Sequence, residues 1–322
     1  MKRITIIIAA LLLSVLLSVL PVLNEPVLSW DDEKTHRLLT EYAADNSVLS
    51  KSKGDYLKII GFSGLDEDLK WDKITQKVIE WIADGSQFED KIDWGFLALT
   101  GQMRASNHFH NPLKPWESAG LDDWFVVHLT GQSSLLWAQD RDKQALFPEG
   151  DWTWQETREH YYFALTSEQQ TEREEYFART FRGLGHQMHL IQDKAVPYHV
   201  RNDVHPEEAL GWKNLAGTSL FETWARDNNP IIEDIASNPD SKIVPLVPFD
   251  VSYNGLVPIT QLIDTDQYDG TNPTENLAQG LAEYTNAIFL ANILYLLRKG
   301  FQRVTDTISH IRKSQARIYR IT

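Results

Sequence analysis

The chain contains no cysteine among its 322 residues. This absence excludes disulfide bonds and thiolate metal sites, so any bound zinc would have to be held by His, Asp, Glu or backbone groups. Basic residues are also scarce, because 31 lysines and arginines stand against 45 aspartates and glutamates, for a net charge of -14. Such an acidic chain repels polyphosphate backbones unless metal ions intervene, which makes nucleic acid the less favoured partner.

Strand signals are few, and neither internal repeats nor low-complexity linkers are present. Helical periodicity dominates instead, and it predicts helices over residues 31–44, 74–85, 167–197 and 273–311. In the third of these, Ser167 and Gln170 have the spacing of a capping box, and Pro197 prevents the helix from continuing.

The domain organisation follows from this pattern. Residues 228–258 are rich in proline and turn residues, which predicts a long loop. A hydrophobic content of 42% is enough for a substantial core. We therefore predict an all-α protein with a single multi-helix domain over residues 30–310, followed by a basic tail at 311–322.

The N-terminus has the layout of a secretory signal peptide at residues 1–29. Two basic residues precede an apolar run from Ile6 to Leu20, and small residues near Ser29 predict cleavage after it. The mature chain would then begin at Trp30 and be secreted or periplasmic. The alternative is an uncleaved membrane anchor, because residues 4–23 are long enough to span a bilayer.

Histidine is concentrated in two short stretches that also carry Asn, Asp and Pro. Six of the ten histidines lie there, namely His108, His110, His186, His189, His199 and His205. On a helix, His189 and Asp193 project from one face, and His199 follows after a proline turn. Imidazole and carboxylate ligands without thiolate suit zinc in a hydrolytic role.

Each of these residues also has a simpler interpretation. A lone His186 or His128 is more often a hydrogen-bonded structural histidine than a ligand. The pair of His189 and Asp193 taken alone is compatible with a surface contact between residues four apart on a helix. The clustering of histidines is what favours metal binding.

The spacing of His189, Asp193 and His199 resembles the HxxxDxxxxxH motif of the zinc-dependent phospholipase C family and of the related zinc-dependent single-strand-specific nucleases. The resemblance implies the all-helical fold of that family and a site for three zinc ions. It covers motifs spread from residue 30 to about residue 222.

Two further motifs carry the same resemblance. Trp30 and His36 are similar to the N-terminal Trp of the family, whose amine and carbonyl bind zinc, and to the His that follows it. His108, in the stretch "NHFHNP", resembles the family histidine that stands before an Asp/Asn-Pro turn.

The resemblance implies a ligand set for each ion. One ion would be held by His108, His189 and Asp193, and a second by Trp30 and His36, with Asp193 bridging the two. His199 would hold the third ion together with a later histidine and a carboxylate.

At this third ion the chain departs from the family pattern. The best carboxylate is Glu222, but Thr218 stands four residues earlier, where a histidine is expected. Either His205 or a water molecule would take over that position.

The family also has an acidic residue upstream that touches the metal and the nucleophile. The stretch "SQFEDKIDW" offers Asp90 as the first choice, Glu89 as its substitute and Asp93 as a third candidate. The implied reaction is displacement of an alcohol from a phosphodiester by metal-activated hydroxide, steered by Asp90.

Three functions remain open at this point. The first is a phospholipase C-like hydrolase that acts on phospholipid and contacts a membrane surface. The second is a single-strand-specific nuclease that stacks bases on aromatic side chains, with Trp116, Trp124, Trp152 and Trp154 as candidates that core packing also explains. The third, supported by Thr218, is a non-catalytic exported metal-binding protein. The oligomeric state is left open.

Overall fold

The computed structural model describes residues 32–50, 54–121, 130–203, 230, 263–270 and 280–287. This part of the chain is mostly helical, as predicted. Its α-helices are α2 (Arg37–Asp45), α3 (Tyr56–Ile59), α4 (Val78–Phe88), α5 (Trp94–Thr100), α6 (Ser134–Trp137), α7 (Arg141–Gln144), α8 (Trp154–Thr166) and α9 (Gln170–Gln192), and residues 281–287 are also helical. Shorter turns are the π-helical η2 (Asp32–His36) and the 3-10 turns η3 (Arg104–Asn107), η4 (Trp116–Ser118) and η5 (Asp193–Ala195).

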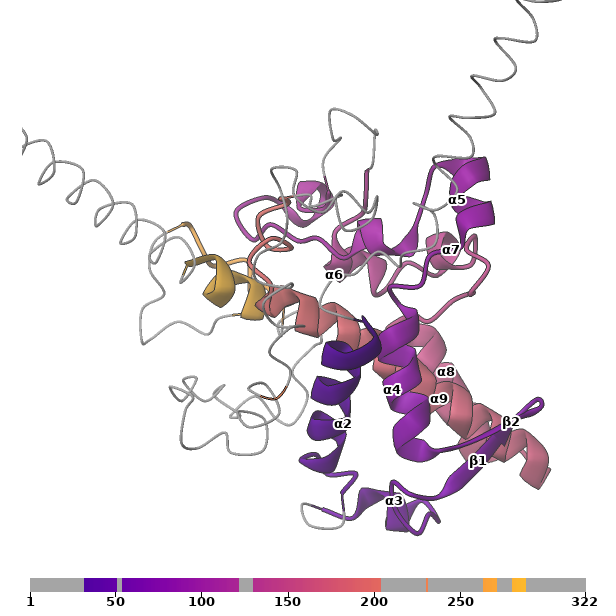
Figure 1. Cartoon of the computed structure of the whole chain (residues 1–322). Coiled ribbons are helices and arrows are strands. Elements are labelled where there is room, and N and C mark those ends of the chain that lie inside the picture. The colour runs from indigo at the N-terminus through magenta and orange to yellow at the C-terminus, as the bar shows by residue number, and fades with distance from the viewer. Residues whose placement is uncertain are drawn as a thin grey trace, which may run out of the picture.

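The long helix α9 is the axis of the described fold (Figure 1). Helices α4 and α8 pack along it, and α2 packs beside α4. Apolar residues of these helices and of the preceding loops form the main core, which includes Leu57, Val78, Trp81, Ile82, Phe177 and Phe181. A smaller core around Trp137, Phe147 and Leu190 joins the segment of α5 to α7 to the C-terminal end of α9.

Two glycines allow α4 and α9 to cross backbone against backbone. A Cβ atom on Gly85 would lie 1.9 Å from the carbonyl oxygen of Arg182, and one on Gly185 would lie 1.9 Å from the carbonyl oxygen of Ile82. Neither position has room for a side chain. The crossing therefore brings the last turns of both helices together.

The predicted helix over 74–85 was wrong for its first residues. Residues Ile74–Lys77 form strand β2, which pairs antiparallel with β1 (Asp68–Trp71). The strands meet at a tight turn in which Asp72 has a left-handed φ of 54°. The β-branched pair Ile74 and Thr75 favours extended backbone, so helix α4 begins only at Val78, whose side chain is fully buried.

The capping box predicted at Ser167 was also wrong. Helix α8 runs up to Thr166, and the backbone N–H of Ser167 bonds the carbonyl oxygen of Phe163 at 2.9 Å. Ser167 thus terminates α8 and does not begin α9, whose N-cap is Gln169. Helix α9 ends at Gln192, before the Pro197 that the sequence marks as its limit.

Several predicted features lie outside the described residues. They are the signal peptide with its cleavage site, almost all of the loop at 228–258, most of the helix at 273–311 and the basic tail. Within the described residues, none of the helices combines the length and the apolar character needed to cross a membrane.

Helix α8 contributes a buried histidine to its contact with α9. Burial, followed by the positive charge of Arg179, lowers the pKa of His160 from 6.5 to about 4. Between these two values the unfolded chain binds a proton that the folded protein does not. The free energy of unfolding should therefore fall as the pH is lowered through this window.

We expect the His160→Gln variant to lose less stability on acidification than the wild type. The difference should be about 1 kcal/mol, less than the full pKa shift implies, because solvent still reaches part of the ring. Urea denaturation of both proteins at about pH 7 and about pH 4.5 measures it. Equal losses in the two proteins would contradict the prediction.

Candidate metal centre

The structure brings six of the predicted residues into one buried cluster. None has more than 2% of its surface exposed, and they are His36, Asp90, His108, His189, Asp193 and His199. They come from separate elements of the fold, namely the end of η2, the loops after α4 and η3, the end of α9 and the turn after η5. The cluster thus depends on the tertiary structure as a whole.

Asp193 occupies the middle of this cluster. Its Oδ1 lies 3.4 Å from Nε2 of His36. Its Oδ2 lies 3.1 Å from Nδ1 of His108, 3.3 Å from Nε2 of His189 and 3.3 Å from Nδ1 of His199. The two oxygens of this carboxylate thus face different imidazoles, and the bridging role that the resemblance implied stays a prediction.

Two overlapping triads in the cluster could hold a metal ion. One consists of His108, His189 and Asp193, and the other of His36, Asp90 and His189. In each triad the candidate ligand atoms lie within 4.8 Å of one another. The first triad is the predicted set for one ion, whereas in the second Asp90 accompanies His36.

Four predicted positions lie outside the described residues. Trp30, His205, Glu222 and the departure at Thr218 all fall there. Of the ligands predicted for the third ion, His199 is therefore the one that lies among the described residues. Its ring stacks on Phe109 at a centroid distance of 4.7 Å.

Hydrogen bonds outside the cluster orient two of its imidazoles. Nδ1 of His189 donates to the carbonyl oxygen of Ser86 at 2.7 Å, and Nδ1 of His36 donates to Oε1 of Gln192 at 2.6 Å. Because both partners can only accept, the proton of each neutral ring sits on Nδ1. The Nε2 lone pair of each ring then points toward the carboxylates, which is the arrangement found in metal-ligating histidines.

The donor set fits a divalent cation. Nε2 of His189 and Nδ1 of His108 lie 3.2 Å apart. Neither carboxylate oxygen of Asp90 accepts a hydrogen bond in the described part of the chain, although the residue is buried. A buried carboxylate without hydrogen bonds is costly unless a cation satisfies it. The cluster could therefore hold metal ions through nitrogen and oxygen ligands.

Electrostatics in the cluster favour charged groups despite their burial. Burial alone would raise the pKa of Asp90, but the charges of His189 and His108 outweigh it and hold the pKa well below its usual range. Burial lowers the pKa of His108, yet the neighbouring carboxylates of Asp193 and Asp90 raise it to about 10. Despite burial, the pKa of His189 is likewise raised, chiefly by the charges of Asp90 and Asp193. Protons thus occupy His108 and His189 when no cation is bound, and binding of a cation would release them.

The structure distinguishes the three acidic candidates. Asp90 faces the cluster, with its Oδ1 3.1 Å from Nδ1 of His108. Glu89 turns away from Asp193 and toward Arg104. Asp93 caps helix α5 by accepting the backbone N–H of Phe96 at 2.8 Å. Of the three, Asp90 is therefore the one whose carboxylate belongs to a candidate metal triad, and its catalytic role stays a prediction.

Two of the remaining histidines have other partners. His186 bonds Oε2 of Glu89 at 2.5 Å and stacks on Trp152. His110 contacts Oδ2 of Asp264 at 2.8 Å. His128 lies outside the described residues.

Sequence reasoning missed Gln192 and Lys194, the neighbours of Asp193. Gln192 holds the ring of His36, and its amide nitrogen donates to Oγ1 of Thr40 at 2.8 Å. Lys194 is fully buried and donates to the carbonyl oxygen of His108. The only feature of the sequence that could have indicated a role for these two residues is their position beside Asp193. Their hydrogen-bond partners are distant in the sequence.

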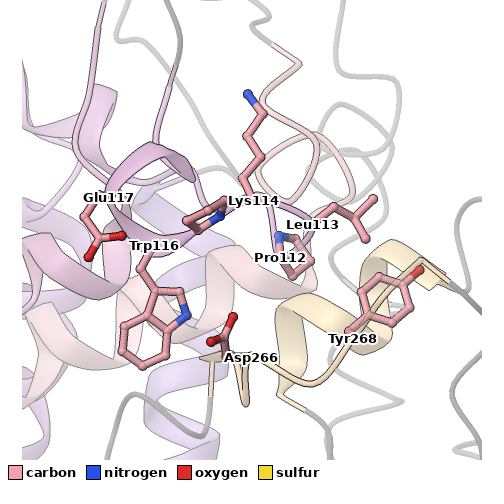
Figure 2. Close-up of a pocket in the computed structure, with 8 residues that line it drawn as sticks. Pro112, Leu113, Lys114, Trp116, Glu117, Asp266 and Tyr268 are labelled. Atoms are coloured by element: carbon pink, nitrogen blue, oxygen red, sulfur yellow. The ribbon is translucent and has the colours of Figure 1, made fainter.

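A pocket of about 430 Å³ lies beside η4 (Figure 2). Its lining consists of Pro112, Leu113, Lys114, Pro115, Trp116, Glu117, Asp266 and Tyr268, none of which belongs to the metal cluster. Nε1 of Trp116 donates to Asp264 at 3.0 Å, which fixes the indole in the wall.

The other candidate tryptophans differ from Trp116. Trp152 is buried in the core, Trp154 is half-buried at the start of α8, and Trp124 lies outside the described residues. Among the three candidate tryptophans that the structure describes, Trp116 is therefore the one that lines this pocket.

No family model matches the chain, and no curated protein or solved structure shows significant similarity to it.

Proposed function

We propose that the protein is an exported zinc-dependent hydrolase of phosphodiester bonds, similar to phospholipase C. The observation that carries this proposal is the position of Asp193, buried among the imidazoles of His36, His108, His189 and His199. Nitrogen and oxygen ligands without thiolate suit zinc with open positions for water and substrate. Three ions are expected, with ligands outside the described residues completing the set.

When bound, zinc lowers the pKa of a water molecule and neutralises charge that develops on a phosphoryl group. The residues of the chain supply placement and proton transfer. Asp193 holds the imidazoles around a shared centre, and Asp90 orients the attacking water and accepts its proton. Both oxygens of Asp90 have capacity for this role, because neither accepts a hydrogen bond in the described part of the chain.

Phospholipid is the favoured substrate, because the net charge of -14 opposes binding of nucleic acid. Action on phospholipid would require contact with a membrane surface. Single-stranded nucleic acid is the second candidate, and the observation in its favour is the pocket wall formed by Trp116, an aromatic side chain on which a base can stack. Assays on phosphatidylcholine vesicles and on a single-stranded oligonucleotide, run side by side, distinguish the two.

Metal removal is the direct test of the proposal. We expect the exported protein to contain three equivalents of zinc and to hydrolyse a phosphodiester substrate. Dialysis against a chelator should abolish hydrolysis, and added zinc should restore it, because protons that replace the cation on the imidazoles are released again when zinc binds. Elemental analysis and N-terminal sequencing of the same sample give the zinc content and the first mature residue.

The other outcomes are equally informative. A protein that binds zinc but hydrolyses neither substrate would support the non-catalytic metal-binding alternative. A protein that binds no zinc after export would contradict the proposal altogether.

A further inference from the structure

Glu89 is a fully buried carboxylate next to the metal centre that the proposed chemistry does not use. Its Oε2 accepts from Nε and Nη2 of Arg104 at 3.1 and 2.8 Å and contacts Nδ1 of His186 at 2.5 Å. Its Oε1 accepts from Nε1 of Trp137 at 2.8 Å. The side chains of Arg104, His186 and Trp137 thus hold both oxygens of the Glu89 carboxylate.

The remaining side of Glu89 faces His108. Oε1 of Glu89 lies 3.6 Å from Nε2 of His108, and this nitrogen makes no hydrogen bond in the described part of the chain. His108 is oriented oppositely to His36 and His189. It presents Nδ1 to the cluster, whereas the other two present Nε2.

An imidazole that binds a cation through Nδ1 must carry its proton on Nε2. That proton needs an acceptor, which Ser86 and Gln192 provide for the Nδ1 protons of the other two rings. For His108, the nearest carboxylate oxygen on the outer side is Oε1 of Glu89. The backbone carbonyl of His108 is held independently by Lys194, so the ring is positioned from both ends.

We propose that Glu89 is a positioning residue of the metal centre, which accepts the Nε2 proton of His108 and so directs its Nδ1 lone pair at the cation. Arg104 keeps Glu89 in place, because its guanidinium is itself fixed by Oε1 of Gln144 and the carbonyl oxygen of Gly150, each at 3.0 Å. The adjacent residues Glu89 and Asp90 thus serve opposite sides of one imidazole. This inference rests on the proposed function only in requiring a bound cation.

The test is the zinc affinity of the full exported chain with Glu89→Gln. Loss of the negative charge behind a ligating histidine typically weakens metal binding by about 10- to 100-fold, and we expect a decrease of that size in competition with a chelator. Cobalt substitution gives a second readout, because a displaced His108 changes the visible absorption of the bound cobalt. A loss of folding stability alone would not change that spectrum.

Glu283→Gln is the matched control, since Glu283 is also fully buried but bonds Thr265 and the backbone of Gly280. It should retain wild-type zinc affinity and cobalt absorption. If Glu89→Gln behaves like this control, the inference about Glu89 is wrong. The proposed function is judged separately, by whether the wild-type protein binds zinc and hydrolyses a phosphodiester.

A measurement on the wild type remains decisive if Glu89→Gln does not fold. Nitrogen-15 spectra of the zinc-loaded protein report which ring nitrogen of each histidine carries the proton. We expect His108 to be protonated on Nε2, and His36 and His189 on Nδ1. Protonation of His108 on Nδ1 would overturn the inference.

Discussion

The Asp193→Asn variant is expected to lose two bound cations together and at least about 100-fold of its phosphodiester hydrolysis. The reason is the position of the carboxylate, whose Oδ1 faces His36 while its Oδ2 faces His108 and His189. An amide of the same shape supplies one neutral oxygen and turns an N–H group toward the other cation. Two metal positions are therefore weakened by one substitution.

Metal content and turnover of the purified variant test this expectation. Asp68→Asn is the control, because it makes the same chemical change at an exposed residue of strand β1, which contributes no residue to the cluster. Circular dichroism of the metal-free proteins shows whether the variant folds, since loss of a buried charge beside imidazolium groups also costs stability. An Asp193→Asn protein with full zinc content and activity would rule out the bridging role.

The Gly185→Ala variant is expected to lose about 3 kcal/mol of its free energy of unfolding, near the upper end of what overpacking usually costs. The added methyl would lie 1.9 Å from the carbonyl oxygen of Ile82 and 2.7 Å from the backbone nitrogen of Ser86. Backbone atoms cannot rotate away, so α4 and α9 must separate. The separation also moves Ser86 from His189, and metal affinity should fall with stability.

Urea denaturation of the metal-free protein measures the stability term without any contribution from the cation. Gly95→Ala is the matched control. Gly95 lies in the exposed helix α5, where a Cβ would approach only Oδ1 of Asp93, at 3.3 Å. Replacement of a helical glycine should raise stability by up to about 1 kcal/mol there. Equal effects of the two substitutions would show that the close helix crossing is not needed.

Local spacing in the sequence accounts for part of the candidate site. His189 and Asp193 were predicted to share a helix face because four residues make about one turn, and in the structure Nε2 of His189 lies 3.3 Å from Oδ2 of Asp193. The structure also places His36 and His108 beside this pair, where the resemblance had put them. The zinc identity, the number of ions and the reaction stay predictions.

Other features depended on contacts that no local pattern encodes. The apolar residues Ile74 and Val78 have the spacing of one helix face, so the periodicity of residues 74–85 predicted a single helix. In the structure Ile74 is half exposed on the hairpin and only Val78 is buried in the core. The resemblance placed Asp90 before Glu89, but no local pattern separates the two adjacent carboxylates. Only the positions of Arg104 and His108 separate their roles.

The sequence by itself determined the helical class, the absence of thiolate ligands and the residue types available for a metal, because these follow from composition and from short-range periodicity. The tertiary structure alone decided which carboxylate faces the imidazoles and which nitrogen each ring presents. The physical reason is that ring orientation is set by hydrogen bonds to distant partners such as Ser86 and Gln192. Ser86 comes within reach of His189 only where α4 and α9 cross at Gly85 and Gly185.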